Sequence, residues 1–130
     1  MKRTVLAACL LVTVVAACGD SSTTAAPISL ATPEDAAAVI SEPGTVLLDI
    51  RTPEEVVTGV IPGATHIDFY AADFADRIGA LDRNTTYVVY CRSGNRSAQA
   101  MDLFRSLEFS SVTEIDGGIV AWSSAGLEIE

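Results

Sequence analysis

Residues 88–101 read VVYCRSGNRSAQAM, an apolar run followed by a cysteine, a polar loop that contains glycine, and a helical pattern. The apolar run is typical of a buried strand, and apolar residues from Ala100 to Leu107 recur at helical spacing. Cys91 therefore lies where a strand is expected to end and a helix to begin. The interpretation of the chain depends on whether this cysteine is inert or reactive.

The rest of residues 28–130 alternates between strand and helix patterns, which predicts an α/β domain with a mainly parallel central sheet and helices on both faces. Ligands on such sheets bind beyond the carboxyl ends of the strands, so the position of Cys91 favours a reactive role. The expected strands are 28–30, 45–50, 86–90 and 111–115, with a short segment of unassigned type at 65–67. The other expected helices are 32–40, 52–59, 71–81 and 119–125.

The N-terminus has the features of an export signal. Residues 1–17 contain two basic residues and then an apolar stretch that is shorter than the roughly 20 residues of a membrane-spanning helix. The sequence Val15-Ala16-Ala17-Cys18 resembles the lipobox of bacterial lipoproteins, in which the cysteine is lipidated and becomes the new N-terminus. The alternative is cleavage near Ala17 without a lipid. Residues 18–27 would then be a lipidated N-terminus and a flexible tether.

This reading predicts an exported protein, anchored by lipid to the outer face of the cell membrane or facing the periplasm. From Cys18 onward the chain has six arginines, no lysine and seventeen acidic residues, a formal charge of −11. Such a charge should repel nucleic acid and anionic headgroups, so the lipid would hold the protein at the membrane.

The cysteine count bears on the role of Cys91. Cys9 lies inside the expected signal, and Cys18 would be used for the lipid. Cys91 would then be the only thiol of the mature domain, although cysteines of exported proteins usually pair. A leftover cysteine is either an inert buried residue or a reactive thiol.

The loop from Cys91 to Arg96, CRSGNR, predicts an anion-binding nest around the sulfur. Gly94 allows a left-handed backbone and Asn95 tolerates one, so several amides can turn inward next to the positive end of the helix. Ser93 and Ser97 are expected to add backbone N–H groups and capping, and Arg92 to attract an anion together with Arg96. Such surroundings lower a cysteine pKa from about 8.5 into a range of roughly 3.5–7.5.

Four other residues have open or structural roles. Asp49 and Arg51, at the end of another strand, form either a pair that braces the loop or part of the substrate site. His66 is the only histidine and is expected to make a structural contact, while Trp122 is expected in the core. One histidine and one thiol cannot form a metal site, so no metal is expected.

Four motifs follow one another along residues 28–130 and together cover nearly all of them. They are Asp49-Ile50-Arg51 followed by Glu54-Glu55, Gly59-Val60-Ile61-Pro62-Gly63-Ala64, the cysteine loop, and Gly117-Gly118-Ile119-Val120-Ala121-Trp122 followed by Gly126. In this order they resemble the rhodanese-like family of sulfurtransferases. One departure is Val60, where the family usually has histidine.

Loop length distinguishes two groups of related enzymes. Sulfurtransferases of this fold use a six-residue loop, whereas the related phosphatases and arsenate reductases use a longer C-x5-R loop. Here the arginine is Arg96, and the sixth residue after Cys91 is Ser97. The resemblance therefore implies a sulfurtransferase.

The resemblance implies a cofactor-independent enzyme that moves sulfur by double displacement. Cys91 would take the sulfane sulfur of a small anionic donor such as thiosulfate, and a thiol or cyanide would then accept it from the persulfide. A monomer is expected. Two alternatives are a persulfide carrier that serves a partner protein, and an enzyme of the phosphatase or arsenate reductase type.

Overall fold

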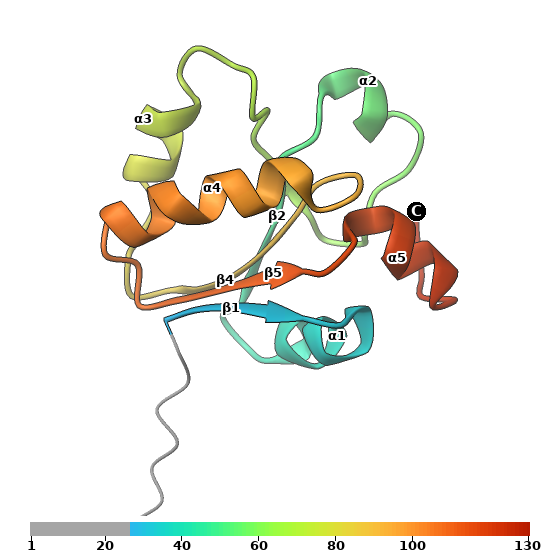
Figure 1. Ribbon diagram of the computed structural model, residues 1–130. Coiled ribbons are helices and arrows are strands. Elements are labelled where there is room, and N and C mark those ends of the chain that lie inside the picture. Colours follow the sequence, from blue (N-terminus) through green and yellow to red (C-terminus); the bar gives the residue numbers. More distant parts are fainter. Residues whose placement is uncertain (1–26) are drawn as a thin grey trace, which may run out of the picture.

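The computed structural model describes residues 27–130, and it shows one sheet with helices packed against both faces (Figure 1). The expected signal, the lipidation site at Cys18 and most of the tether lie outside the described residues. The strands are β1 (Ile28–Ala31), β2 (Val46–Asp49), β3 (Thr65–His66), β4 (Thr86–Tyr90) and β5 (Ser111–Ile115). The helices are α1 (Pro33–Ser41), α2 (Pro53–Val56), α3 (Phe74–Gly79), α4 (Asn95–Ser106) and α5 (Gly118–Ser124).

The sheet has the strand order β1-β5-β4-β2-β3, and every neighbouring pair is parallel. The carboxyl ends of all strands therefore point to one edge. β4 lies at the centre, between β2 and β5, so the residues after Tyr90 leave the sheet at the middle of that edge. The predicted α/β class with a parallel sheet is confirmed.

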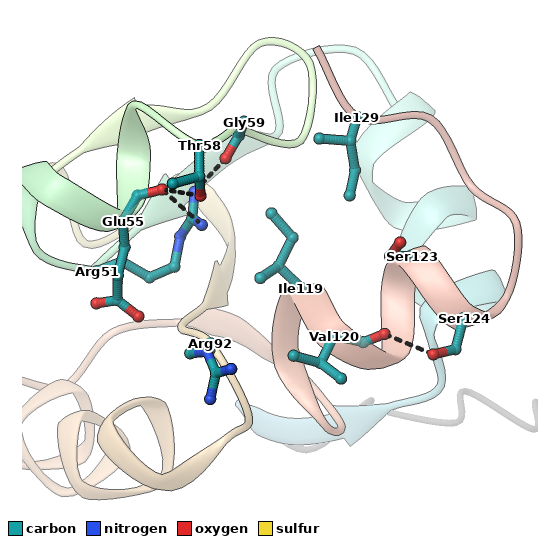
Figure 2. A pocket seen from close by; sticks show the side chains of 10 residues that line it. All are labelled: Arg51, Glu55, Thr58, Gly59, Arg92, Ile119, Val120, Ser123, Ser124 and Ile129. Atoms are coloured by element: carbon teal, nitrogen blue, oxygen red, sulfur yellow. Dashed lines mark hydrogen bonds between the residues drawn. The ribbon is translucent and has the colours of Figure 1, made fainter.

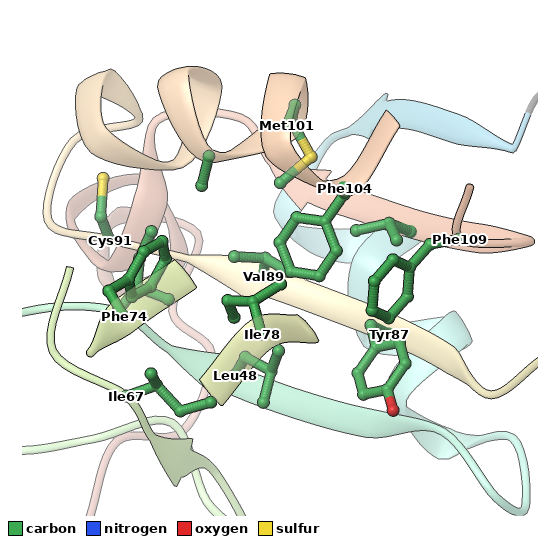
Figure 3. Packing of buried hydrophobic residues seen from close by; sticks show 13 residues of the cluster. Leu48, Ile67, Phe74, Ile78, Tyr87, Val89, Cys91, Met101, Phe104 and Phe109 are labelled. Carbon is green, nitrogen blue, oxygen red and sulfur yellow. The ribbon is translucent and has the colours of Figure 1, made fainter. Parts of the chain in front are cut away.

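Alternation along β4 divides its side chains between two separate cores. Val89 belongs to the cluster under α3 and α4, as does Cys91 just after the strand, whereas Val88 and Tyr90 belong to the cluster under α1 and α5. Figure 3 shows the first cluster, in which Phe104, Phe109 and Tyr87 pack around the aliphatic residues of the sheet. The side chains of β4 are almost completely buried on both faces, which fixes the strand and hence the position of Cys91.

Two helices are shorter than the sequence pattern predicts. α2 ends at Val56 and not near Gly59, because the chain turns through Thr58 and Gly59, whose backbone φ is +127°. α3 begins at Phe74 and not at Ala71, since residues 68–73 form turns that present Phe74 and Ile78 to the core. Trp122 is buried, as expected, and donates from its indole nitrogen to the Glu128 carbonyl at 2.8 Å.

Between residues 27 and 130, no helix is long and apolar enough to cross a membrane.

Candidate active site

Cys91 is the first residue after β4 and lies directly before the loop that leads into α4. Its exposed fraction is only 1%, because it packs at the edge of the core beneath α4 (Figure 3). It is a free cysteine. The fold therefore places a single shielded sulfur at the carboxyl edge of the sheet, next to the N-terminus of a helix of twelve residues.

The loop turns back over the sulfur. Gly94 has a backbone φ of +98°, and its amide donates a hydrogen bond to Cys91 Sγ at 3.1 Å. The hydroxyl of Ser97 lies 3.5 Å from the same sulfur. Asn95 is not left-handed; it begins α4, and its carbonyl accepts a hydrogen bond from Gln99. Of the two residues that could have made the turn, glycine is the one that does so.

Hydrogen bonds decide the pKa of the Cys91 thiol. Burial alone would raise this pKa, because it disfavours the charged form. The side chain and amide of Ser97, together with the amides of Gly94 and Ser93, more than offset burial, and the pKa lies below the ordinary cysteine value. The loop therefore favours the thiolate, which is the nucleophilic form of cysteine.

Arg96 pairs with a carboxylate in α2. Its two terminal nitrogens donate to the two oxygens of Glu55 at 2.7 and 2.8 Å, a bidentate arrangement. The guanidinium also lies over the ring of Tyr70, 5.7 Å from the ring centre. The hydrogen bond from Arg96 is the main reason why the pKa of Glu55 falls to about 2. Arg96 thus ties the loop to α2, and its charge is balanced locally.

Arg92 differs from Arg96 in that it is exposed and its side chain has no hydrogen bond or ion pair with any residue from 27 to 130. In Figure 2 its side chain stands alone at the rim of a cavity. Of the two predicted anion-attracting arginines, Arg92 is therefore the one whose charge remains available to a ligand.

Asp49 and Arg51 form a buried ion pair at the end of β2, with a shortest N–O distance of 2.6 Å. The remaining donors of Arg51 bond to the carbonyls of Glu55 and Gly59, and Asp49 also accepts from the Tyr90 hydroxyl. The sequence left open whether this pair braces the site or binds substrate. Because all of these polar groups are already bonded, the geometry favours the bracing role.

The N-terminus of α5 donates backbone hydrogen bonds to the cysteine loop. The amide of Ile119 donates to the Cys91 carbonyl at 3.0 Å, and that of Val120 donates to the Arg92 carbonyl at 3.1 Å. A side chain at Gly118 would come within 2.5 Å of the Cys91 carbonyl oxygen, so only glycine fits there. The Gly117-Gly118 pair therefore lets a helix end approach the backbone of the loop closely.

A cavity of about 350 Å³ lies between the α2 region, α5 and the C-terminal tail (Figure 2). Its walls are partly apolar, with Ile119, Val120 and Ile129, and Arg92 supplies a charge at its edge. Arg51 also lines it, although only 3% of this residue is exposed. Cys91 is not among the lining residues, so the cavity adjoins the loop across Arg92.

Several residues that build the site were not predicted as part of it. Glu55 and Gly118 were noted only as members of motifs. Glu114 on β5 had no expected role, yet it is buried and accepts a hydrogen bond from Ser97. A charged residue within the strand pattern SVTEI was the one available signal for Glu114. His66 makes the expected structural contact, bonding to the Arg51 carbonyl.

Among residues 27–130, no group of three histidine, cysteine or carboxylate side chains is arranged to hold a metal ion. The site is made of one sulfur, the amides and hydroxyl around it, and two arginines with different surroundings.

The fold and site together define a class of protein: a parallel α/β domain that holds one cysteine in a short loop between the central strand and a helix. The sequence model of the rhodanese-like domain matches residues 32–125, and the chain therefore belongs to the rhodanese-like family. The chain is 40% identical over 92 residues to thiosulfate sulfurtransferase GlpE of Pseudomonas entomophila, which covers 71% of this chain and 82% of the relative. It is 37% identical over 84 residues to a sulfurtransferase of Allochromatium vinosum, which covers 65% and 77% respectively.

Solved structures agree with the fold. A rhodanese-related protein of Thermoplasma volcanium superimposes with a TM-score of 0.70 at 26% identity, over 78% of this chain and 97% of that one. A Rhodopseudomonas palustris protein of unknown function, described as a possible tyrosine phosphatase, gives a TM-score of 0.66 at 32% identity, over 79% and 85%. The curated relatives support a sulfurtransferase of the rhodanese type.

Proposed function

We propose that this protein transfers a sulfane sulfur from a small anionic donor, such as thiosulfate, to a thiol or cyanide through a persulfide on Cys91. The observation that carries the proposal is the hydrogen bonding of a single buried sulfur by the Gly94 amide and the Ser97 hydroxyl at the N-terminus of α4. These groups favour the thiolate form of Cys91.

In the first half-reaction the Cys91 thiolate attacks the outer sulfur of thiosulfate. The S–S bond to Cys91 forms, the sulfur–sulfur bond of the donor breaks, and sulfite leaves with the electron pair. The terminal sulfur of the persulfide carries one negative charge, which the inward amides of the loop and the helix dipole would stabilise. Arg92, exposed and without a carboxylate partner in the described chain, would attract the donor to this acidic protein.

In the second half-reaction a nucleophile attacks the terminal sulfur, and Cys91 leaves as the thiolate. With cyanide the product is thiocyanate; with a cellular thiolate it is a new persulfide. The same lowered pKa that makes Cys91 a nucleophile makes it a good leaving group. No cofactor enters either step.

Loop length supports sulfur over phosphate transfer. A tetrahedral oxyanion in a C-x5-R loop is held by the arginine, whereas Arg96 comes one position early and is bonded bidentately to Glu55. Arg96 is thus engaged in an ion pair with Glu55.

The decisive experiment is mass spectrometry of the full chain after incubation with thiosulfate and removal of the donor. We expect one sulfur atom to be added, located by digestion with trypsin on the peptide of residues 84–92, which contains Cys91 as its only cysteine. Cys91→Ser is the matched control, because it retains the other cysteines and should gain nothing.

An unmodified Cys91 peptide after donor treatment would count against the proposal. Hydrolysis of an aryl phosphate by the wild-type chain but not by Cys91→Ser would establish the phosphatase alternative. Release of thiocyanate at a rate that matches persulfide decay would distinguish a turning-over enzyme from a carrier for a partner protein.

We further propose that the chain is exported and anchored by lipid at Cys18. The support is the sequence alone, namely the basic and apolar start and the lipobox-like Val15-Ala16-Ala17-Cys18. Growth with labelled palmitate should label the wild-type chain and leave Cys18→Ala unlabelled. Equal labelling of Cys9→Ala and wild type would place the lipid on Cys18, and absence of label from the wild type would overturn the anchor.

A further inference from the structure

Glu114 is a buried carboxyl group for which the sulfur transfer described above has no use. It lies on β5, next to the central strand, and only 8% of the residue is exposed. Its Oε1 atom reaches the underside of the cysteine loop, where it would be 4.0 Å from a side-chain carbon placed at Gly94. A carboxyl group in such a position requires a bonding partner.

The partner is Ser97, whose hydroxyl connects Glu114 to the reactive sulfur. Ser97 Oγ lies 2.7 Å from Glu114 Oε1 and 3.5 Å from Cys91 Sγ. Ser97 has no exposed surface, so water cannot readily replace either contact. The same Oγ is 3.2 Å from the Gly94 carbonyl, which is a weaker competing acceptor. Cys91, Ser97 and Glu114 thus form a continuous buried chain.

A serine hydroxyl has one proton to donate, and this limits which states the chain can adopt. When Glu114 is ionised, Ser97 donates to the carboxylate, and its oxygen can only accept a hydrogen bond from the Cys91 thiol. When Glu114 is protonated, the carboxylic acid donates to Ser97, and the serine proton becomes free to bond to a Cys91 thiolate. The two states differ by the transfer of one proton along the chain.

We propose that Glu114 is a positioning residue that shares one proton with Cys91 through Ser97. In this transfer the S–H bond of Cys91 breaks, Ser97 accepts that proton while it passes its own to Glu114, and a thiolate and a carboxylic acid result. The total charge of the group stays at −1. The inference deepens the proposed function, because it explains how the thiolate is formed, but proton sharing does not itself require sulfur transfer.

The surroundings of Glu114 are compatible with this sharing. Burial is the largest influence and raises the pKa of Glu114, opposed by the Ser97 hydrogen bond. The nearby charges are Asp116, which also raises it, and Arg105 of α4, which lowers it. The residues paired with Glu114 on the neighbouring strands, Leu30 and Val89, are uncharged. The carboxyl group can therefore take up a proton at a higher pH than an exposed glutamate would.

The consequence concerns the pH dependence of Cys91 reactivity. Two groups that share a proton titrate as a pair, in two macroscopic steps. Between the steps, only part of the population holds the proton on Glu114 and exposes the thiolate. Reactivity should therefore rise once, reach an intermediate level and rise again when the shared proton is lost.

The test measures the rate at which iodoacetamide alkylates Cys91 in the full chain between about pH 4 and pH 10, a range that spans carboxyl and thiol titration. The tryptic peptide of residues 84–92 reports Cys91 separately from Cys9 and Cys18. We expect two rises for the wild type. Glu114→Gln should show a single rise, at a pH below the second rise of the wild type. At the pH of the wild-type intermediate level, Cys91 of this variant should be alkylated at least about twofold faster than Cys91 of the wild type.

Two further variants distinguish proton sharing along Cys91, Ser97 and Glu114 from a general effect of nearby charge. Ser97→Ala removes the connection and should give a single rise. Asp116→Asn removes a nearby exposed charge outside the chain, and it should retain both rises. A single rise in the wild type, or two rises in Glu114→Gln or Ser97→Ala, would overturn the inference. The readout is alkylation, so it is independent of whether thiosulfate leaves a persulfide, and failure of one proposal is distinguishable from failure of the other.

Discussion

The ends of β2 and β4 lie side by side at one edge of the sheet, and both carry polar residues that the chain buries. At the end of β2, Asp49 and Arg51 bond to each other and to the carbonyls around them. At the end of β4, the loop places hydrogen-bond donors around the Cys91 sulfur. A neutral thiol can be buried without such donors, because it behaves as a small apolar group. A site that satisfies all its groups stabilises the fold, whereas one that has donors to spare can stabilise a transient charge.

The two regions are also connected. Arg51 bonds to the carbonyl of Glu55, and the carboxylate of Glu55 bonds to Arg96 in the loop. The closed cluster therefore holds α2, and α2 holds the loop. Changes on the two sides should consequently differ in kind, affecting stability at β2 and chemistry at β4.

The largest effect is expected at the sulfur. Cys91→Ser should reduce sulfur transfer below detection, because a serine hydroxyl is neither ionised at neutral pH nor able to form the persulfide. The free energy of unfolding should change little, since the volume is nearly conserved. Urea unfolding with a cyanide-dependent thiocyanate assay measures both. Residual turnover by this variant would place the nucleophile elsewhere.

A large effect of the opposite kind is expected at the end of β2. Arg51→Ala leaves Asp49 buried without its cation, and breaking such a pair costs about 3–5 kcal/mol of stability. Chemical denaturation should show the loss as a lower midpoint. Arg105→Ala is the matched control, because it breaks an exposed ion pair and should lower the free energy of unfolding by less than about 1 kcal/mol. Equal midpoints would mean that the closed cluster does not stabilise the fold.

A smaller effect separates the two arginines of the loop. Arg92→Gln should raise the KM for thiosulfate about three- to tenfold with little change in kcat, since an exposed charge pair is worth about 1 kcal/mol. Added salt should weaken thiosulfate binding to the wild type more than binding to the variant. Arg96→Gln should also weaken donor binding, but with an accompanying loss of stability because Glu55 loses its partner. If Arg96→Gln raised KM without any loss of stability, the ion pair with Glu55 would not be the main role of the Arg96 charge.

The smallest effect is expected at Glu55, which connects the end of β2 to the cysteine loop. The hydrogen bond from Arg96 lowers the pKa of Glu55 from 4.5 to about 2. Glu55 therefore stabilises the folded chain above pH 4.5, and this contribution is lost as the pH falls toward 2. We expect Glu55→Gln to be about 1 kcal/mol less stable at pH 7, with the difference shrinking between pH 5 and pH 2 in urea unfolding. A difference that is constant with pH would contradict a role for the charge.

Much of this comparison could be predicted from the sequence. The β4 pattern and the glycine after Cys91 were enough to predict a strand, a tight turn and a helix start. Helix bounds were less accurate at α2 and α3, because a turn through Thr58 ends α2 early and turns up to Asp73 delay the start of α3. The two loop arginines were not distinguishable, since their roles depend on Glu55, 41 residues from Arg96 in sequence.

The sequence by itself determined the class of fold, the position of Cys91 and the length of its loop, because hydrophobic periodicity and local turn chemistry act over a few residues. Only the tertiary structure decided which charges are available. It paired Arg96 with Glu55, left Arg92 exposed, closed the Asp49–Arg51 cluster and brought Glu114 to Ser97. These contacts join separate strands and helices, and hydrogen bonds of that kind are set by the packing of the sheet and not by neighbours in the chain.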